Sequence, residues 1–410
     1  MGEPSDTQCA ACCAPTTKKC AGCKVRAYCS KACQTKDWPT HKKICSDLKL
    51  EHILGRAAAL IQDAYLSFRK NTWSDTIKKV EDREDALIIH DGDPWESPQG
   101  FVKFPDDIVP ANKRARLGVL TAWRCDEPYA SLATLIEKLL HGKCLKIDIE
   151  ELGVLFKTVP RKTTAVHYTR GEPHSNWPDC KHVMLRVKSR KSDKQWVLDV
   201  TGAQYGIVEV LHDWSKYEHD YVDKVVGVYQ LGAHRRILTE VAKGAGMATL
   251  SYGLIGRAAV VLDKALTMWE TQNQSVSSIR ALADTAFAEK KASLLDTLDR
   301  AVRAFNTTND FTDLVCKAKA DDSGFTQHMT KMRIDSLTAE ANLLLRYPGG
   351  KPTMMDRLRE KFGPDYAYRD GDEYCLPVDE LLEFHDKEFN QPVEQKYVYD
   401  GKNKVHHYFV

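Results

Sequence analysis

Seven cysteines and one histidine near the start of the chain have the residue types and the spacing of metal ligands. They follow the pattern C-x2-C-x7-C-x2-C-x5-C-x3-C-x7-H-x3-C. Thiolate sulfur and imidazole nitrogen suit Zn²⁺, and eight such ligands fill two tetrahedral sites with no position left for water or substrate. The pattern therefore predicts two structural zinc ions rather than a catalytic metal. The predicted ligands are Cys9, Cys12, Cys20, Cys23, Cys29, Cys33, His41 and Cys45.

The wider cysteine pattern favours metal binding over disulfides. Of the 13 cysteines, eight lie between Cys9 and Cys45. The N-terminus lacks the apolar segment of a secretory signal and no apolar run is long enough to cross a bilayer, so we expect a protein of the cytoplasm or nucleus with no membrane partner. Thiols stay reduced in those compartments, which makes clustered cysteines metal ligands. Cys13, which directly follows Cys12, is expected to be a free, partly exposed thiol.

Short helices are expected to position the later ligands. Cys29 and Cys33 are four residues apart, and so are His41 and Cys45. Residues at i and i+4 lie on one face of a helix, so each pair can serve one ion. Pro39 suits the first turn of the second of these helices. So short a segment buries too little apolar surface to fold alone, and the bound metal must supply that free energy.

The segment over residues 9–45 resembles the MYND-type zinc finger. The resemblance includes Tyr28, the aromatic residue before the fifth ligand, and the stretch that runs from Cys33-Gln34 through Asp37-Trp38 to His41 and Cys45. Spacing alone leaves open which ligands share an ion. The resemblance implies a cross-braced pairing, with one zinc held by Cys9, Cys12, Cys29 and Cys33 and the other by Cys20, Cys23, His41 and Cys45.

The same resemblance implies a role in protein–protein interaction. MYND fingers are mostly interaction modules, and some bind proline-rich peptides in transcriptional or other regulatory complexes. The groove residues of those members correspond here to Gln34 and Trp38, and an extended proline-rich peptide loses little entropy when it packs on an indole. Alternatively, Trp38 packs under its own finger and Gln34 is only solvated. Ala21 departs from the pattern, because peptide-binding members can carry a serine after the third ligand.

Nucleic-acid binding by a basic face of the finger is a further alternative. Residues 1–50 carry nine Lys or Arg and four Asp or Glu, in a chain whose net charge is +2. Seven ligand thiolates and two Zn²⁺ together contribute -3, which lowers the balance of this segment from +5 to about +2. The charge therefore does not favour nucleic acid, whose binding would depend steeply on salt.

Beyond the finger, the sequence predicts an α+β fold, with a mixed α/β body followed by a mainly helical C-terminal region. A helical stripe over residues 48–70 is expected to dock the finger on the body. The runs His182–Val187 and Gln195–Val200 predict an antiparallel hairpin, and helical sequence is expected from there to about residue 230. The predicted units are a finger over 1–48, a body over 49–230, a helical region over 231–347, and a C-terminal helix and hairpin over 348–410.

The hairpin carries residues that could support catalysis. His182 opens the first strand and Asp199 lies near the end of the next, so the carboxylate could orient an imidazole that deprotonates a cysteine. The stretch from His182 to Gly206 resembles the transglutaminase-like or papain-like superfamily, which implies a cysteine hydrolase or acyltransferase, degenerate or active. In the alternative, the two residues only hydrogen-bond within a sheet.

The nucleophile of such a site is not evident from the sequence. A reactive thiol is favoured by a helix N-terminus, and we expect Pro128 to interrupt any helix next to Cys125. Cys144 and Cys180 are the other candidates. Phosphate-loop, dinucleotide and serine-hydrolase motifs are absent from the sequence. We therefore expect the finger, rather than an enzymatic site, to carry the function.

Overall fold

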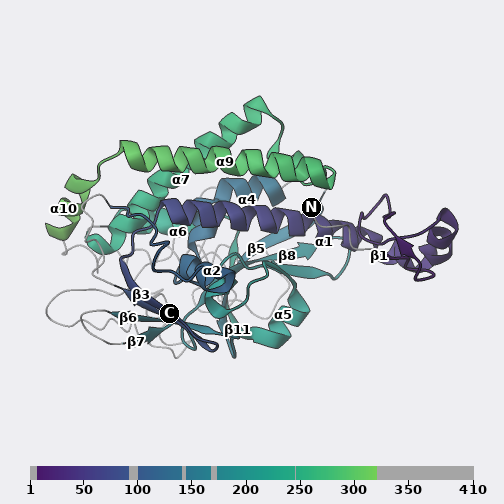
Figure 1. Cartoon of the computed structure of the whole chain (residues 1–410), viewed down its shortest axis with the longest axis horizontal. Coiled ribbons are helices and arrows are strands. Elements are labelled where there is room, and N and C mark those ends of the chain that lie inside the picture. The colour runs from purple at the N-terminus through teal and green to yellow at the C-terminus, as the bar shows by residue number, and fades with distance from the viewer. Residues whose placement is uncertain (1–6, 92–99, 141–144, 168–172, 245, 321–410) are drawn as a thin grey trace, which may run out of the picture.

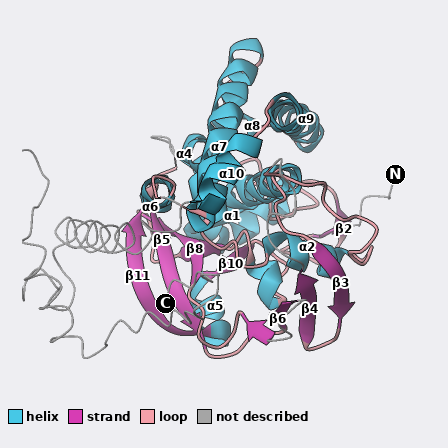
Figure 2. Ribbon diagram, turned by 90° about the vertical axis from the view of Figure 1, so that its left-hand side faces the viewer, coloured by secondary structure: helices cyan, strands magenta, loops and turns pink. Residues whose placement is uncertain are grey.

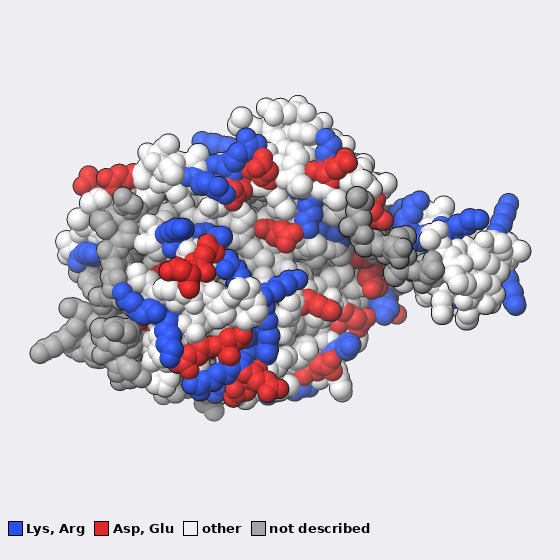
Figure 3. All heavy atoms as spheres, viewed as in Figure 1, with Lys and Arg blue, Asp and Glu red and all other residues white. Residues whose placement is uncertain are grey.

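Helix α1 (Lys31–Asn71) connects the N-terminal finger to the body of the protein (Figure 1). The computed structural model describes residues 7–91, 100–140, 145–167, 173–244 and 246–320. The finger begins with the short antiparallel strands β1 (Thr7–Gln8) and β2 (Pro15–Thr16). It projects from one end of the molecule (Figures 1 and 3), and its Lys and Arg side chains stand apart from one another on the face drawn in Figure 3.

One continuous helix replaces the separate helices expected over the finger and residues 48–70. Pro39 lies inside α1 rather than at the start of a second helix. A proline in this position loses one hydrogen bond to the preceding turn. Finger ligands lie on both sides of it, Cys33 before and His41 after, so metal binding holds the two parts of the helix in line. The helix also runs through the proposed domain boundary at residue 48, and the division into domains stays a prediction.

Ser30 caps the N-terminus of α1, because its side chain accepts a hydrogen bond of 3.2 Å from the backbone N–H of Cys33. We expect Ser30→Ala to cost about 1 kcal/mol, which would weaken zinc binding by about fivefold. Ser30→Asn keeps a good capping side chain and should retain the wild-type affinity. Competition with a zinc chelator measures both variants, and equal affinities for the two would show that the cap contributes nothing.

Two sheets form the body. The five-stranded sheet is antiparallel throughout, in the order β10-β9-β8-β5-β11. Its strands are β5 (Ile147–Phe156), β8 (His182–Ser189), β9 (Gln195–Leu198), β10 (Leu211–Asp213) and β11 (Val222–Gln230). The four-stranded sheet has the order β3-β4-β6-β7, with β4 and β6 parallel. Its strands are β3 (Ile77–Asp82), β4 (Ala86–Asp91), β6 (Lys162–His167) and β7 (Pro173–Ser175).

The predicted hairpin is confirmed, since β8 pairs with β9 and Leu185 lies opposite Leu198. The expectation of helix up to residue 230 is wrong for β11. This segment contains four valines, and β-branched side chains favour a strand. Between strands β9 and β11 the chain forms a 3₁₀ turn, η1 (Gly202–Tyr205), and the helix α5 (Trp214–Tyr221).

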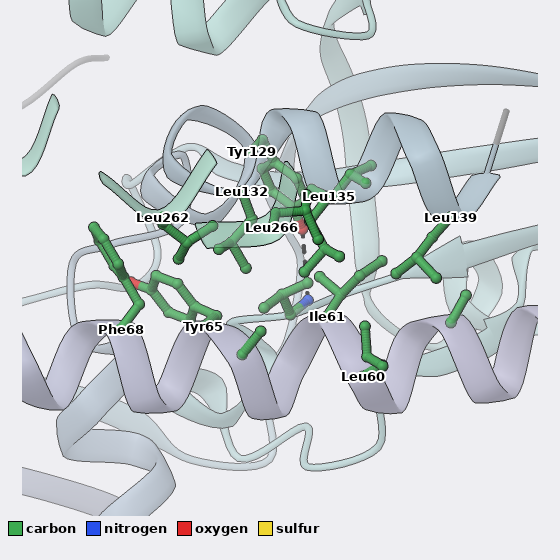
Figure 4. Close-up of a cluster of buried hydrophobic side chains, with 14 of the residues drawn as sticks. Leu60, Ile61, Tyr65, Phe68, Tyr129, Leu132, Leu135, Leu139, Leu262 and Leu266 are labelled. Atoms are coloured by element: carbon green, nitrogen blue, oxygen red, sulfur yellow. Dashed lines mark hydrogen bonds between the residues drawn. The ribbon is translucent and has the colours of Figure 1, made fainter. Parts of the chain in front are cut away.

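Helices cover one face of the five-stranded sheet (Figure 2). Val183, Leu185 and Val187 point into the same core as the buried face of α1, whereas Met184 belongs to a second core on the opposite face. Figure 4 shows Ile61 and Tyr65 of α1 meeting leucines from the covering helices. The helices before β5 are α2 (Lys113–Thr121), α3 (Glu127–Ser131) and α4 (Ala133–Leu140).

The helical region predicted after residue 231 is present as far as the structure describes it. A stripe from Ile255 to Trp269 is buried on α7 (Met247–Gln272), which packs against α9 (Asp284–Thr308), and α9 packs against α1. No helix among the described residues is long and apolar enough to cross a membrane. Residues 321–347 and the helix and hairpin predicted over 348–410 lie outside the described residues. The helices are α6 (Ala233–Val241), α7 (Met247–Gln272), α8 (Val276–Ile279), α9 (Asp284–Thr308) and α10 (Thr312–Ala320).

Candidate metal centres and a buried histidine–aspartate pair

The first metal site joins Cys9 and Cys12 to Cys29 and Cys33, with all four sulfurs within 4.8 Å of one another. The Sγ of Cys12 lies 3.5 Å from that of Cys29 and 3.8 Å from that of Cys33. Sulfurs at the corners of a zinc tetrahedron are about 3.8 Å apart, since each Zn–S bond is about 2.3 Å. The four residues therefore fit a zinc ion.

The second metal site joins Cys20 and Cys23 to His41 and Cys45. The Nε2 of His41 is the ligand atom, 3.3 Å from the Sγ of Cys20 and 3.7 Å from that of Cys23. Each site thus combines one pair from the loops with one pair from the later part of the finger. The cross-braced pairing implied by the resemblance is confirmed, and the cofactor is two structural zinc ions.

The ionisation of neighbouring thiols in the first site is coupled, which favours a bound cation. A hydrogen bond from the Cys29 backbone lowers the pKa of Cys9 to about 6, whereas hydrogen bonds to Cys33, Cys12 and Cys9 raise the pKa of Cys29 to about 12. One thiolate in the cluster therefore keeps its neighbours protonated. A divalent ion among them removes this repulsion and allows all four sulfurs to ionise, which is how such a site takes up zinc.

Asp37 braces the finger against α1. Its carboxylate accepts a 2.6 Å hydrogen bond from the hydroxyl of Tyr28 and a 3.1 Å bond from Arg26. Burial and Asp37 together raise the pKa of Tyr28, so its hydroxyl stays a donor. The sequence assigned no role to Arg26, because nothing in the spacing of these residues indicates that the finger brings them together.

The remaining finger residues singled out in the sequence occupy the surface. Cys13 is exposed, belongs to neither metal site, and has a φ of 61°. Gln34 and Trp38 are one turn apart on α1. The side-chain nitrogen of Gln34 lies 3.7 Å from the Sγ of Cys20, and the indole of Trp38 meets His41 edge-on at 5.8 Å while remaining 42% exposed.

The structure also brings together His182 and Asp199 in the body. The Nε2 of His182 is 2.8 Å from Oδ1 of Asp199, and both side chains are fully buried. Asp199 accepts a second hydrogen bond, of 2.7 Å, from the hydroxyl of Tyr217. Burial raises the pKa of Asp199, but His182 and these hydrogen bonds outweigh it and lower the pKa below its usual value. Asp199 is therefore a buried carboxylate at neutral pH.

Of the predicted nucleophiles, Cys125 contacts the backbone beside His182. Its Sγ is 3.6 Å from the carbonyl oxygen of Lys181, the residue before His182. The expectation that Pro128 prevents a nearby helix is wrong. Pro128 lies in the first turn of α3, where its missing N–H has no partner to lose. Cys180 contacts the carbonyl oxygen of Ser175, and Cys144 lies outside the described residues.

Comparison with known proteins identifies the finger. Residues 9–45 match the family model of the MYND finger. The zinc finger MYND domain-containing protein 10 homolog of Drosophila melanogaster is 56% identical over 41 residues, which are 10% of this chain and 9% of that protein. The SET domain and MYND-type zinc finger protein 6 of Schizosaccharomyces pombe is 45% identical over 58 residues, 13% of this chain and 12% of that protein.

A third similar protein, the dauer abnormal formation protein 25 of Caenorhabditis elegans, is 57% identical over 42 residues, 10% of this chain and 11% of that protein. The chain thus spans about a tenth of the length of these curated relatives. No solved structure matches the chain. The family match therefore describes the finger, and the similar curated proteins match 10–13% of this chain.

Proposed function

We propose that this protein, whose residues 9–45 are a MYND finger, uses the finger to recruit another protein through a proline-rich peptide. The observation that carries the proposal is the exposed indole of Trp38 on a module that projects from the body (Figure 1). Both metal sites have their four protein ligands, so the ions support the fold and leave no coordination position for a substrate. The module would act in transcriptional or other regulatory complexes of the cytoplasm or nucleus.

Gln34 and Trp38 provide complementary contacts for such a peptide. An extended proline-rich segment is already ordered in solution, and its pyrrolidine rings pack on an indole face. The side-chain amide of Gln34 directs an N–H at Cys20, so its carbonyl oxygen is available to accept a hydrogen bond from a peptide N–H. We do not propose nucleic-acid binding, because the zinc-loaded finger carries little net charge.

We expect Trp38→Ala to weaken peptide binding at least tenfold, since buried tryptophans contribute more than about 1.4 kcal/mol at interfaces. Ile44→Ala is a matched control. Ile44 lies on the same helix and is 39% exposed, but it points about 120° away from Trp38. Proline-rich peptides selected from a displayed library serve as probes, titrated by fluorescence against proteins that retain two zinc ions. Equal losses for the two variants, or none for Trp38→Ala, would refute the proposed groove.

A further inference from the structure

His182 has one engaged and one unengaged ring nitrogen. Nε2 faces Asp199, whereas Nδ1 is buried and has no hydrogen-bond partner among the described residues. The rings of Phe156 and Tyr205 lie against the imidazole, with centroids 5.2 and 4.9 Å away. A carboxylate on Nε2 holds the proton on that nitrogen and leaves Nδ1 as a base. The buried imidazole is thus prepared to accept a proton at Nδ1.

Cys125 lies beside the backbone of the same histidine. Its Sγ is 3.6 Å from the carbonyl oxygen of Lys181 and hydrogen-bonds the backbone of Val183, so it contacts the peptide groups on both sides of His182. Strand β9 ends at Leu198, before it would reach this part of β8. Cys125 is partly buried as a residue, and its thiol occupies the edge of β8 that β9 leaves open.

Hydrogen bonds from both sides fix the chain around Cys125. The backbone N–H of Trp123 donates to the side-chain oxygen of Gln204 at 3.0 Å, at a φ of 52° that few residues with a side chain adopt. After the cysteine, the hydroxyl of Tyr129 donates to the carbonyl oxygen of Leu198 at 3.2 Å. Segments distant in sequence are therefore locked together where the thiol meets the ends of β8 and β9.

Two further buried polar atoms, on the segments that contain Cys125 and Cys180, have no hydrogen-bond partners among the described residues. They are Nε1 of Trp123 and Oγ of Ser175. The indole of Trp123 stands 6.1 Å from the ring of His174, and the Sγ of Cys180 contacts the carbonyl oxygen of Ser175. Buried polar groups normally find partners, so the unsatisfied indole N–H two residues before Cys125 indicates a polar ligand.

We propose that Cys125, His182 and Asp199 form a nucleophilic site that transfers the acyl group of an ester or amide. The S–H of Cys125 gives its proton to Nδ1 of His182 as the sulfur bonds the acyl carbon. The leaving alcohol or amine takes that proton as its bond to the acyl carbon breaks, which leaves a thioester. Water or an amine then attacks the thioester, loses a proton through His182, and restores the thiol. Asp199 orients the imidazole, and the indole N–H of Trp123, which has no partner among the described residues, is a donor for the substrate carbonyl.

The surroundings of Cys125 favour its protonated thiol, so attack by the sulfur requires His182 as a base. Burial, and then the neighbouring Asp126, raise the pKa of the Cys125 thiol, so the sulfur is protonated at rest. A protonated thiol is a poor nucleophile and attacks an acyl group only as its proton is removed. The site therefore differs from one in which a thiolate–imidazolium ion pair exists before the substrate binds. Its activity depends on proton removal by Nδ1 of His182.

The test uses the full zinc-loaded chain and p-nitrophenyl acetate as the acyl donor. We expect p-nitrophenolate release with one acetyl group on Cys125, located by peptide mass mapping. Cys125→Ser should lower the acetylation rate by on the order of 100-fold, and so should His182→Gln. Cys180→Ser and Cys316→Ser are the controls that retain the rate, Cys316 being an exposed thiol far along the chain.

Two outcomes overturn the proposal. The first is acetyl spread over several cysteines, with unchanged release in Cys125→Ser. The second is a Cys125 that stays unmodified in the folded wild-type protein. If His182→Gln does not fold, as judged by circular dichroism, the acetylation rates of Cys125→Ser and Cys180→Ser decide whether Cys125 is the nucleophile. Trp38→Ala should retain the acetylation rate, which separates this inference from the function proposed for the finger.

Discussion

Removal of zinc should unfold the finger while the body keeps its fold. The finger core consists mainly of the ligands themselves with Tyr28, so little apolar packing remains without the metal. Zinc contributes about 10–16 kcal/mol to comparable small domains, more than such a segment can replace. The second half of α1 is held separately, because Leu54, Ile61 and Tyr65 belong to the main core of the body.

Native mass spectrometry measures this effect directly. The wild type should carry two zinc ions, and a Cys9→Ala/Cys20→Ala double variant, which loses one ligand from each site, should carry fewer. Cys13→Ala is the matched control, since Cys13 is a neighbouring thiol outside both metal sites, and it should keep both ions. One ion or none in the wild type, or loss of zinc from Cys13→Ala, would contradict the assignment of the ligands.

Asp199→Ala should destabilise the body by about 3–5 kcal/mol. The substitution leaves the Nε2–H of His182 and the hydroxyl of Tyr217 buried without their common acceptor, and breaking a buried charged network by removing one partner has this magnitude. Tyr217→Phe removes a single hydrogen bond from the same carboxylate and should cost about 1 kcal/mol. Urea denaturation followed by tryptophan fluorescence measures both. Equal losses for the two variants would show that the His182–Asp199 pair contributes little.

The lowered pKa of Asp199 predicts part of the loss of folding stability of the protein in acid. The pKa of Asp199 is lower in the folded state than in the unfolded chain, so the unfolded chain binds a proton first as the pH falls. The stabilisation is complete above the unfolded pKa of about 3.9 and is lost as the pH falls through the folded value. Asp199→Ala should therefore show a weaker loss of stability below about pH 4 than the wild type. If the free energy of unfolding of Asp199→Ala falls with decreasing pH as steeply as that of the wild type, other carboxyl groups account for the loss of stability.

The local order of residues determined the metal chemistry of this protein. Ligand spacing is a short-range property, and eight Cys and His ligands within 37 positions have few ways to surround two ions. The hairpin of β8 and β9 was predictable for the same reason, because alternation along a strand reflects its own two faces. Short-range reasoning was wrong at Pro39 and Pro128, since both lie in helices that contacts elsewhere in the finger and body stabilise.

Only the tertiary structure decided what surrounds His182. Its contact with Asp199 spans 17 residues and depends on the hairpin register, whereas the approach of Cys125 to Lys181 spans 56 residues and depends on α3 docking where β9 ends. The parallel pairing of β4 with β6 and the strand β11 likewise depend on distant partners. The sequence by itself therefore determined that the finger binds zinc, because its ligands are neighbours along the chain. The fold decided which thiol contacts the backbone beside the buried histidine, because packing between distant segments places Cys125 against Lys181.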